Sequence, residues 1–270
     1  MHLKSLLLSL VAVSAAAPAA DSFNNAYNFP QLGNLYSRIS QLIPKGIPST
    51  CDTSKINLPS YKNASKELPP PDGLKPMYVG IGRGTQVWSR FLTSGSIIAN
   101  SSGKKKNYTC ADSTSNSKPQ AIGARASLFD ATCLAADYPQ IVEMVPGVIY
   151  NIPLLSLQGG IFRALGIDLM ARHFFPEATT PEFNFDITPP KYKGVMMTKK
   201  QDQMDAKGNA AKGKYGAVPW LYLTKTTGTV GKFESVYRVD TASGSPPDTC
   251  QGMAASFEIE YSANYYFFGS

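Results

Sequence analysis

The chain has 270 residues, of which 43% are hydrophobic and 17% charged, and its formal net charge is +7. This length suits one large domain or two small ones, and single all-β domains of this size are common. Beyond the N-terminal stretch no apolar run approaches ~18 residues, which argues against a membrane span.

The first 20 residues have the features of a secretory signal peptide. Lys4 precedes an apolar run, and small residues follow as Ala17-Pro18-Ala19. Such a stretch is too short and wrongly flanked to be a membrane anchor. We therefore expect residues 1–20 to be removed from a secreted protein, and the loss of Lys4 lowers the net charge from +7 to +6.

Residues 21–76 are rich in Pro, Asn and Ser, and the stretches PKGIPSTCD and ELPPPDGLKP interrupt any regular element. We expect a loop-rich N-terminal lead-in with one short helix near Leu35–Ile43. From Met77 the pattern changes to short strands, so residues 77–270 are predicted to form a single β domain.

The segment GIGRGTQ places three glycines at alternate positions, Gly80, Gly82 and Gly84. A dinucleotide-binding loop needs the spacing G-x-G-x-x-G at the start of a helix, and neither condition is met. In a strand the three glycines share one face and leave it bare. A bulky neighbour such as Trp220 is expected to pack there.

The central region contains patterns typical of strands, helices and loops. AIGARASLFDA, residues 121–131, favours a strand, and Tyr138–Val145 favours a short helix that ends at Pro146-Gly147. IFRALGIDLMARHFF, residues 161–175, is compatible with a helix or a strand. Lys191–Tyr215 is polar and is expected to be a loop.

The C-terminal region gives the clearest strands. In SFEIEYSANYYFF the residues Phe257 to Phe267 alternate between apolar and mostly polar positions, which is the period of a strand. KFESVYRVD alternates in the same way, and VPWLYLT supplies another strand. ASGSPPDTCQG is a turn-rich connection, so the last two strands are expected to be antiparallel neighbours. The fold class is therefore all-β, a sandwich or barrel of mostly antiparallel strands with a loop-rich N-terminal segment and one or two short helices.

The four cysteines, Cys51, Cys110, Cys133 and Cys250, form an even set in a chain expected to enter an oxidising compartment. Two disulfides are the default, and the sequence leaves three connectivities open. No C-x-x-C motif is present, and after removal of the signal peptide His173 is the one remaining histidine. We expect neither a metal site nor a cofactor.

Asn63, Asn100 and Asn107 each begin an N-glycosylation sequon, a pattern that matters in a secreted chain.

His173 is the one histidine available for acid–base chemistry, and Asp168, Glu177 and Glu182 lie near it in the sequence. A carboxylate–imidazole pair is therefore conceivable, but no G-x-S-x-G elbow accompanies it. The alternative is a structural histidine among aromatic residues.

Tyrosines of the predicted strands offer a second kind of site, because aromatic rings stack on sugars. The alternative is that they form an aromatic core. The residues concerned are Tyr222, Tyr237, Tyr261, Tyr265 and Tyr266.

Several pieces of the chain together resemble a secreted domain family of unknown function, found in filamentous fungi with more distant bacterial members. They are LPPPDGLKPMYVGIGRGTQ, NYTCADS, SKPQAIGARASLFDATC, the RHFF around His173, AVPWLYL, VYRVDTASGSPPDTC and YSANYYFF. The resemblance covers most of residues 45–270 and implies a β-rich secreted fold without an established reaction. Several fungal members carry the label "malate dehydrogenase", which the absence of a dinucleotide loop does not support.

In that family the glycine segment continues directly into the sequon, as GRGTQ-NYTC. Here Val87–Lys106, VWSRFLTSGSIIANSSGKKK, separates Gln86 from Asn107. Its 20 residues correspond to 60 nucleotides, and Val87-Trp88, Ala99-Asn100 and Lys106 can each be encoded by codons that resemble splice signals. Our hypothesis is therefore a retained intron translated in frame. The alternative is a genuine loop insertion.

This segment also affects the net charge of the mature chain and one of the three sequons. Without its four basic residues the mature net charge falls from +6 to +2, which removes most of the case for a polyanionic partner such as nucleic acid. Asn100 is doubtful as a glycosylation site because it lies in this segment.

The resemblance further implies a Cys110–Cys250 disulfide and, with it, Cys51–Cys133. The function expected is a non-enzymatic cell-surface or extracellular binding protein whose partner is a cell-wall glycan or a host surface. The alternative is a secreted hydrolase that uses His173 with Asp168, Glu177 or Glu182. The sequence does not indicate an oligomeric state.

Overall fold

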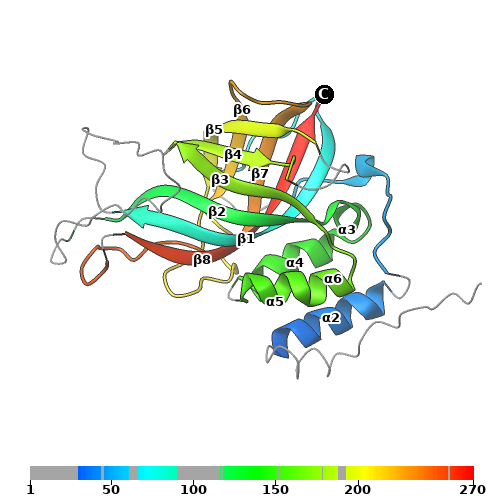
Figure 1. Ribbon diagram of the computed structural model, residues 1–270, viewed down its shortest axis with the longest axis horizontal. Helices are drawn as coiled ribbons and strands as arrows, with labels where there is room; N and C mark the ends of the chain where they lie inside the picture. The colour runs from blue at the N-terminus through cyan, green and yellow to red at the C-terminus, as the bar shows by residue number, and fades with distance from the viewer. Residues whose placement is uncertain are drawn as a thin grey trace, which may run out of the picture.

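In the computed structural model an eight-stranded antiparallel sheet closes on itself as a barrel (Figure 1). The structure describes residues 30–43, 46–60, 66–89, 116, 118–150, 152–177, 179–187, 193–254 and 256–270. The strands in these residues are β1 Lys75–Ser89, β2 Gln120–Asp130, β3 Leu169–Glu177, β4 Thr180–Asn184, β5 Val195–Met204, β6 Trp220–Lys225, β7 Phe233–Ser243 and β8 Ser256–Gly269. Each strand pairs with the next, and β8 pairs with β1. The all-β prediction is therefore confirmed, in its barrel form.

Short helices cover one side of the barrel, where α4 packs against β1, β7 and β8 (Figure 1). The described helices are α2 Pro30–Leu42, the 3-10 turn η1 Thr53–Lys55, α3 Thr132–Asp137, α4 Pro139–Ile149, α5 Leu154–Gly159 and α6 Ile161–Ala164. Four of them, α3 to α6, form the long connection between β2 and β3. Below we call this group the helical layer.

The two faces of β8 pack into two separate apolar cores. Tyr265 and Phe267 point into the barrel, whereas Tyr266 and Phe268 point outward into the core beneath the helical layer. The period-two pattern of the C-terminal segment is thus the pattern of a strand between two cores. β7 and β8 pair antiparallel, as predicted.

Arg83 joins the barrel to the helical layer. Its side chain is 3% exposed, and its Nε donates to the carbonyl oxygens of Ile149 and Ile152, each at 3.1 Å. These carbonyls lie at and just beyond the C-terminal end of α4, where backbone acceptors lack helical partners and a cation is favoured. Glu260 pairs with the same guanidinium from β8.

Two predicted boundaries are wrong. α4 continues through Pro146 to Ile149, because a side chain of β8 satisfies the carbonyl that Pro146 leaves without a donor, as discussed below. The polar segment 195–204 is strand β5 rather than loop. Its apolar signal is carried by few positions, such as Met196 inside the barrel, while Lys199 and Lys200 are exposed. The ambiguous segment 161–175 contains the short helix α6 followed by β3.

In the part of the chain that the structure describes, no helix has both the length and the hydropathy needed to span a bilayer.

Candidate functional site

The barrel is filled at one end and hollow at the other. Phe185, Phe233 and Phe267 close the filled end, with the rings of Phe185 and Phe233 stacked at a centroid distance of 4.8 Å. At the other end lies a cavity of about 290 Å³. We call this end the mouth; it is where β1 ends, β2 begins and β7 leads into β8. Apolar side chains make up much of the cavity wall: Ala124, Phe175, Phe183, Val218, Leu221 and Leu223.

Arg238 of β7 places a cation at this cavity. Its side chain is 8% exposed, and its Nη2 donates to the carbonyl of Pro219 at 2.9 Å. Its Nε is buried and has no hydrogen-bond partner. Among the described residues no carboxylate forms an ion pair with it, and no acidic residue lines the cavity. A buried charge without a counter-charge is unfavourable unless something else interacts with it.

Gln86 of β1 adds a second donor to the cavity wall. It is 6% exposed, and its Nε2 makes no hydrogen bond of ordinary geometry, although it lies beside the phenol of Tyr261. The hydroxyls of Tyr261 and Tyr265 are 2.8 Å apart and bond to each other. Burial raises the pKa of both phenols, so both are neutral at physiological pH.

His173 of β3 lines the same cavity and is 5% exposed. Its ring stacks on Phe183 at a centroid distance of 4.3 Å, and its Nδ1 lies 2.9 Å from the backbone oxygen of Glu182. Burial lowers the pKa of His173 to about 4; the bond to Glu182 raises the pKa, and the charge of Arg238 lowers it further. The imidazole is therefore neutral at pH 7.

The structure does not bring the expected carboxylates to His173. Asp168 and Glu177 are exposed near the two ends of β3. Glu182 is opposite Phe174 in the β3–β4 pair, so its side chain lies on the other face of the sheet from His173 and accepts a bond from Asn184 at 3.1 Å. A carboxylate–imidazole pair is absent among these residues, because Asp168 and Glu177 lie at the ends of β3 and Glu182 lies on the other face of the sheet.

The three glycines of β1 share one face, as the alternate spacing predicted. That face points into the barrel, but Trp220 does not pack on it. A Cβ at Gly82 would lie 2.5 Å from Cε2 of Tyr265, and one at Gly80 would lie 2.7 Å from Cε of Met170. Trp220 belongs instead to the outer core. The pairing of β8 with β1 determines which side chain covers the glycines. It puts Ala263 opposite Gly82, so the nearby Tyr265 lies over this glycine.

The tyrosines proposed as a sugar-stacking surface do not form one. Tyr237, Tyr261, Tyr265 and Tyr266 are buried, and Tyr222 stacks on Tyr237 at a centroid distance of 4.8 Å. The aromatic-core interpretation describes these residues better.

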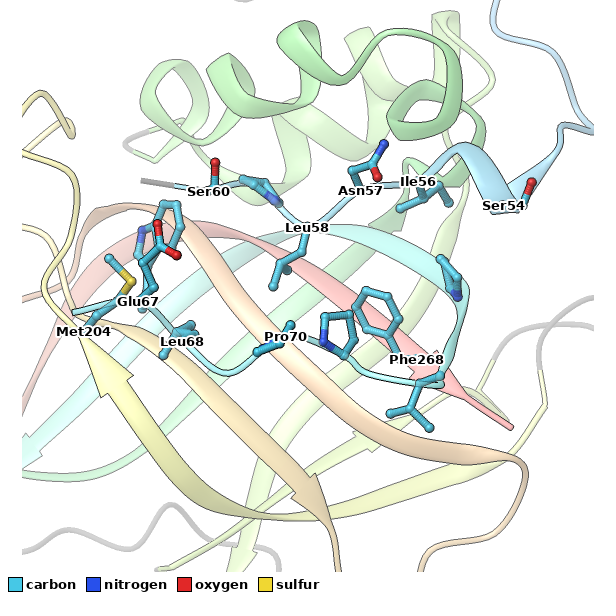
Figure 2. Close-up of a pocket in the computed structure, with 15 residues that line it drawn as sticks. Ser54, Ile56, Asn57, Leu58, Ser60, Glu67, Leu68, Pro70, Met204 and Phe268 are labelled. Carbon is cyan, nitrogen blue, oxygen red and sulfur yellow. The ribbon is translucent and has the colours of Figure 1, made fainter. Parts of the chain in front are cut away.

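A second cavity, of about 380 Å³, lies outside the barrel against the N-terminal segment (Figure 2). Two passes of that segment, carrying Leu58 and Leu68, frame it over the strands (Figure 2). Among its polar groups, Ser54 bonds to Asp52 at 2.6 Å, Glu67 is exposed, and the indole N–H of Trp220 is buried without a hydrogen-bond partner. Its lining lacks the buried, unpartnered cation that marks the barrel cavity.

The structure contains a disulfide between Cys51 and Cys133, which ties the N-terminal segment to α3. Cys250 is buried and has no disulfide partner among the described residues. Cys110, its expected partner, lies outside the described residues, as do Asn63, Asn100 and Asn107, so these assignments stay predictions. No group of three or more His, Cys, Asp or Glu in the described residues is arranged to hold a metal ion.

Sequence reasoning missed Arg238 and Gln86. Simple alternation in KFESVYRVD groups Arg238 with Glu234, Val236 and Asp240 on the face opposite Phe233. A register shift between Phe233 and Ser235 instead puts Phe233, Val236 and Arg238 on the inner face. The signal for Gln86 was available, since it continues the inward face of Gly80, Gly82 and Gly84.

Comparison with known families agrees with the resemblance. Residues 94–269 match the family described as protein of unknown function (DUF3455), and residues 8–66 match a second one, protein of unknown function (DUF2990). No curated protein and no solved structure matches the chain. Since the first match covers more than half of the sequence and most of the barrel, the chain belongs to the DUF3455 family of proteins of unknown function.

Proposed function

We propose that this protein binds a small, largely apolar molecule with an acidic group in the mouth of its barrel. The observation that carries the proposal is Arg238, a guanidinium that is 8% exposed and faces the cavity without a carboxylate partner in the described chain. An arginine stays charged at any physiological pH. An acidic ligand supplies the counter-charge that the barrel itself does not.

The cavity fits such a ligand in size and lining. Its volume of about 290 Å³ is at the lower end of the range for small-molecule sites, which run from ~300 to ~1,000 Å³. Apolar and aromatic walls with few polar groups are typical of these sites. Arg238 and Gln86 are among the few polar groups of this lining, and their Nε and Nε2 atoms make no hydrogen bond of ordinary geometry.

We propose that binding takes place outside the cell. Residues 1–20 read as a signal peptide, the Cys51–Cys133 disulfide suits an oxidising compartment, and sequons are present. We therefore keep the interpretation of a secreted, non-enzymatic binding protein. The barrel cavity favours a small acidic molecule as its ligand over the wall glycan or host surface expected from the sequence.

The test is calorimetric titration of the purified protein with naphthoate and with naphthamide, which has the same ring system but no charge. We expect naphthoate to bind at least ~10-fold more tightly, since a hydrogen bond to a charged group contributes about 1.5–3 kcal/mol. Arg238→Met should abolish this preference. The exposed Arg125 of the same barrel provides the matched control, Arg125→Met, which should bind both probes like the wild type.

The stability of the same variants separates a ligand-binding arginine from a structural one. Replacing a buried, uncompensated charge with an apolar side chain is often neutral or stabilising. We expect Arg238→Met to unfold at the same urea concentration as the wild type or a higher one. Equal binding of the two probes, or loss of binding only together with loss of folding, would contradict the proposal.

A further inference from the structure

We infer that the ligand carries a hydroxyl group or a similar hydrogen-bond donor in addition to its acidic group, and that His173 is the residue that recognises it. This inference rests on the proposed function and specifies the ligand class of the same cavity. It makes His173 a specificity-determining residue rather than a catalytic one.

The position of the imidazole is fixed on two sides. Its ring stacks on Phe183 at 4.3 Å and lies 5.4 Å from the ring of Phe175, measured between centroids. Nδ1 is held 2.9 Å from the backbone oxygen of Glu182. Because the side chain points inward from β3, Nε2, which is farther from the backbone, extends toward the barrel interior.

The bond to Glu182 also determines which ring nitrogen carries the proton. A carbonyl oxygen can only accept, so Nδ1 must be the protonated nitrogen that donates. In the neutral imidazole Nε2 then bears a lone pair. The bond at Nδ1 is the one hydrogen bond that the described residues give this side chain. Nε2 therefore presents its lone pair as an acceptor at the wall of the cavity.

The cavity therefore offers its ligand both hydrogen-bond donors and a hydrogen-bond acceptor. Arg238 Nε lacks an acceptor and Gln86 Nε2 makes no hydrogen bond of ordinary geometry. His173 offers an acceptor, because its one hydrogen bond among the described residues is at Nδ1. The three side chains line one cavity, and the charge of Arg238 is close enough to affect the imidazole. A single molecule with an acidic group at one point of an apolar or aromatic frame and a hydroxyl at another satisfies all three.

Neighbouring residues do not supply a hydrogen-bond donor to His173 Nε2. Tyr265 lies 5.9 Å from the imidazole between centroids, but its hydroxyl is engaged with that of Tyr261 at 2.8 Å. The carboxyl of Glu182 is on the outer face of the sheet, bonded to Asn184. The donor that completes the site is thus expected from the ligand.

The experiment compares naphthoate with naphthoates hydroxylated at each free ring position, and with the methoxy counterpart of the tightest hydroxylated one. Affinity for the full-length secreted protein is measured by calorimetry. We expect one hydroxyl position to bind about 3- to 10-fold more tightly than naphthoate, the gain of one net hydrogen bond. The methoxy compound, which cannot donate, should show no gain.

Variants of His173 test whether the imidazole causes this gain in affinity. In His173→Phe, which keeps a stacked ring, the hydroxyl should give no advantage while naphthoate itself still binds. His173→Gln, which keeps an acceptor, should retain part of the advantage. If a variant does not fold, the comparison of hydroxyl and methoxy compounds on the wild type still tests whether the site recognises a hydrogen-bond donor.

Two other results would overturn the inference in distinguishable ways. If naphthoate binds through Arg238 but no hydroxyl position improves on it, or methoxy does as well as hydroxyl, His173 is not a donor-recognising residue and the proposed function stands. If neither naphthoate nor its hydroxylated forms bind, the proposed function fails and the inference fails with it.

Discussion

The side-chain amide of Asn264 donates a 2.9 Å hydrogen bond to the carbonyl of Val142. In a regular helix the N–H of the residue four positions later donates to this oxygen, but that residue is Pro146, which has no N–H. Asn264 is fully buried on the outer face of β8 and so replaces the missing backbone donor. This explains how α4 runs through a proline that the sequence marks as its end.

Asn264→Leu is therefore expected to lower the free energy of unfolding by about 1–3 kcal/mol, because it leaves a buried carbonyl without a donor. Asn264 also donates to Asp240 at 3.0 Å, so the single variant mixes two effects. Pro146→Ala separates them, since it restores an N–H to the helix. In that background Asn264→Leu should cost about 1 kcal/mol less, as measured by urea unfolding of the four proteins. Equal losses in both backgrounds would show that Asn264 does not serve Val142.

The ring of Tyr265 occupies the space that a side chain at Gly82 would need. A Cβ there would come within 2.5 Å of Cε2 and 3.0 Å of Cδ2 of that ring. Gly82→Ala is expected to destabilise the protein by about 1–3 kcal/mol and to shift Tyr265 into the binding cavity, weakening naphthoate binding. Gly147→Ala is the matched control: its Cβ would be 3.7 Å from the nearest atom, in a helix where alanine is favoured. Unfolding of Gly82→Ala at the wild-type urea concentration would refute the packing argument.

Much of the barrel was predictable because its strands separate two cores. Alternation in the C-terminal segment marked β8, and the glycine spacing marked an inward face on β1, since both signals depend only on the period of a strand. β5 escaped detection because its mouth end is solvated on both faces, which removes the alternation. The choice between barrel and sandwich needs the pairing of β1 with β8, a contact between residues far apart in sequence that no local pattern records.

The candidate site was less predictable for a related reason. His173 was identified because histidine is rare in this chain, but its partner is a backbone carbonyl, which any residue at position 182 provides. Simple alternation places Arg238 on the face opposite Phe233, whereas a register shift in β7 brings both to the inner face. The chemistry of the site comes from three strands, β1, β3 and β7, that only the closed barrel brings together.

Stability should depend on pH through His173. Its pKa is about 4 in the folded protein against 6.5 in the unfolded chain, so between these values the unfolded state binds more protons. The free energy of unfolding is therefore expected to fall as pH drops from 6.5 to 4, by on the order of 3 kcal/mol, and to lose nothing more from this group below pH 4. The contribution of His173 is fully present above pH 6.5.

His173→Phe isolates this effect, because every other titrating group is common to both proteins. The measurement is urea unfolding of wild type and variant at pH values from 7 to 4. The difference between the two curves should decline across that window. A difference that stays constant would mean that the imidazole is not held neutral by burial.

The segment Val87–Lys106 begins in the last residues of β1, which end at Ser89 opposite Gln120 of β2. If the segment is a retained intron, Asn107 directly follows Gln86, and Asn107–Thr109 take the three strand positions of Val87–Ser89. Since Gln86 faces the cavity, alternation then puts Asn107 on the outer face, where a glycan can be attached, and Tyr108 at the mouth. The joined sequence thus fits the strand that the barrel requires.

We expect transcript sequencing to find reads that join the codons of Gln86 and Asn107. Intact mass measurement of the purified protein, treated to remove any N-glycans, should find the chain shorter by these 20 residues. The family match starts at residue 94, within the segment, so the transcript rather than the alignment tests the hypothesis. Uniformly unspliced reads, together with peptides spanning Val87–Lys106 in the purified protein, would establish a genuine insertion. The shortened chain should bind naphthoate as tightly as or more tightly than the full one, since every described residue assigned to the cavity lies outside the segment.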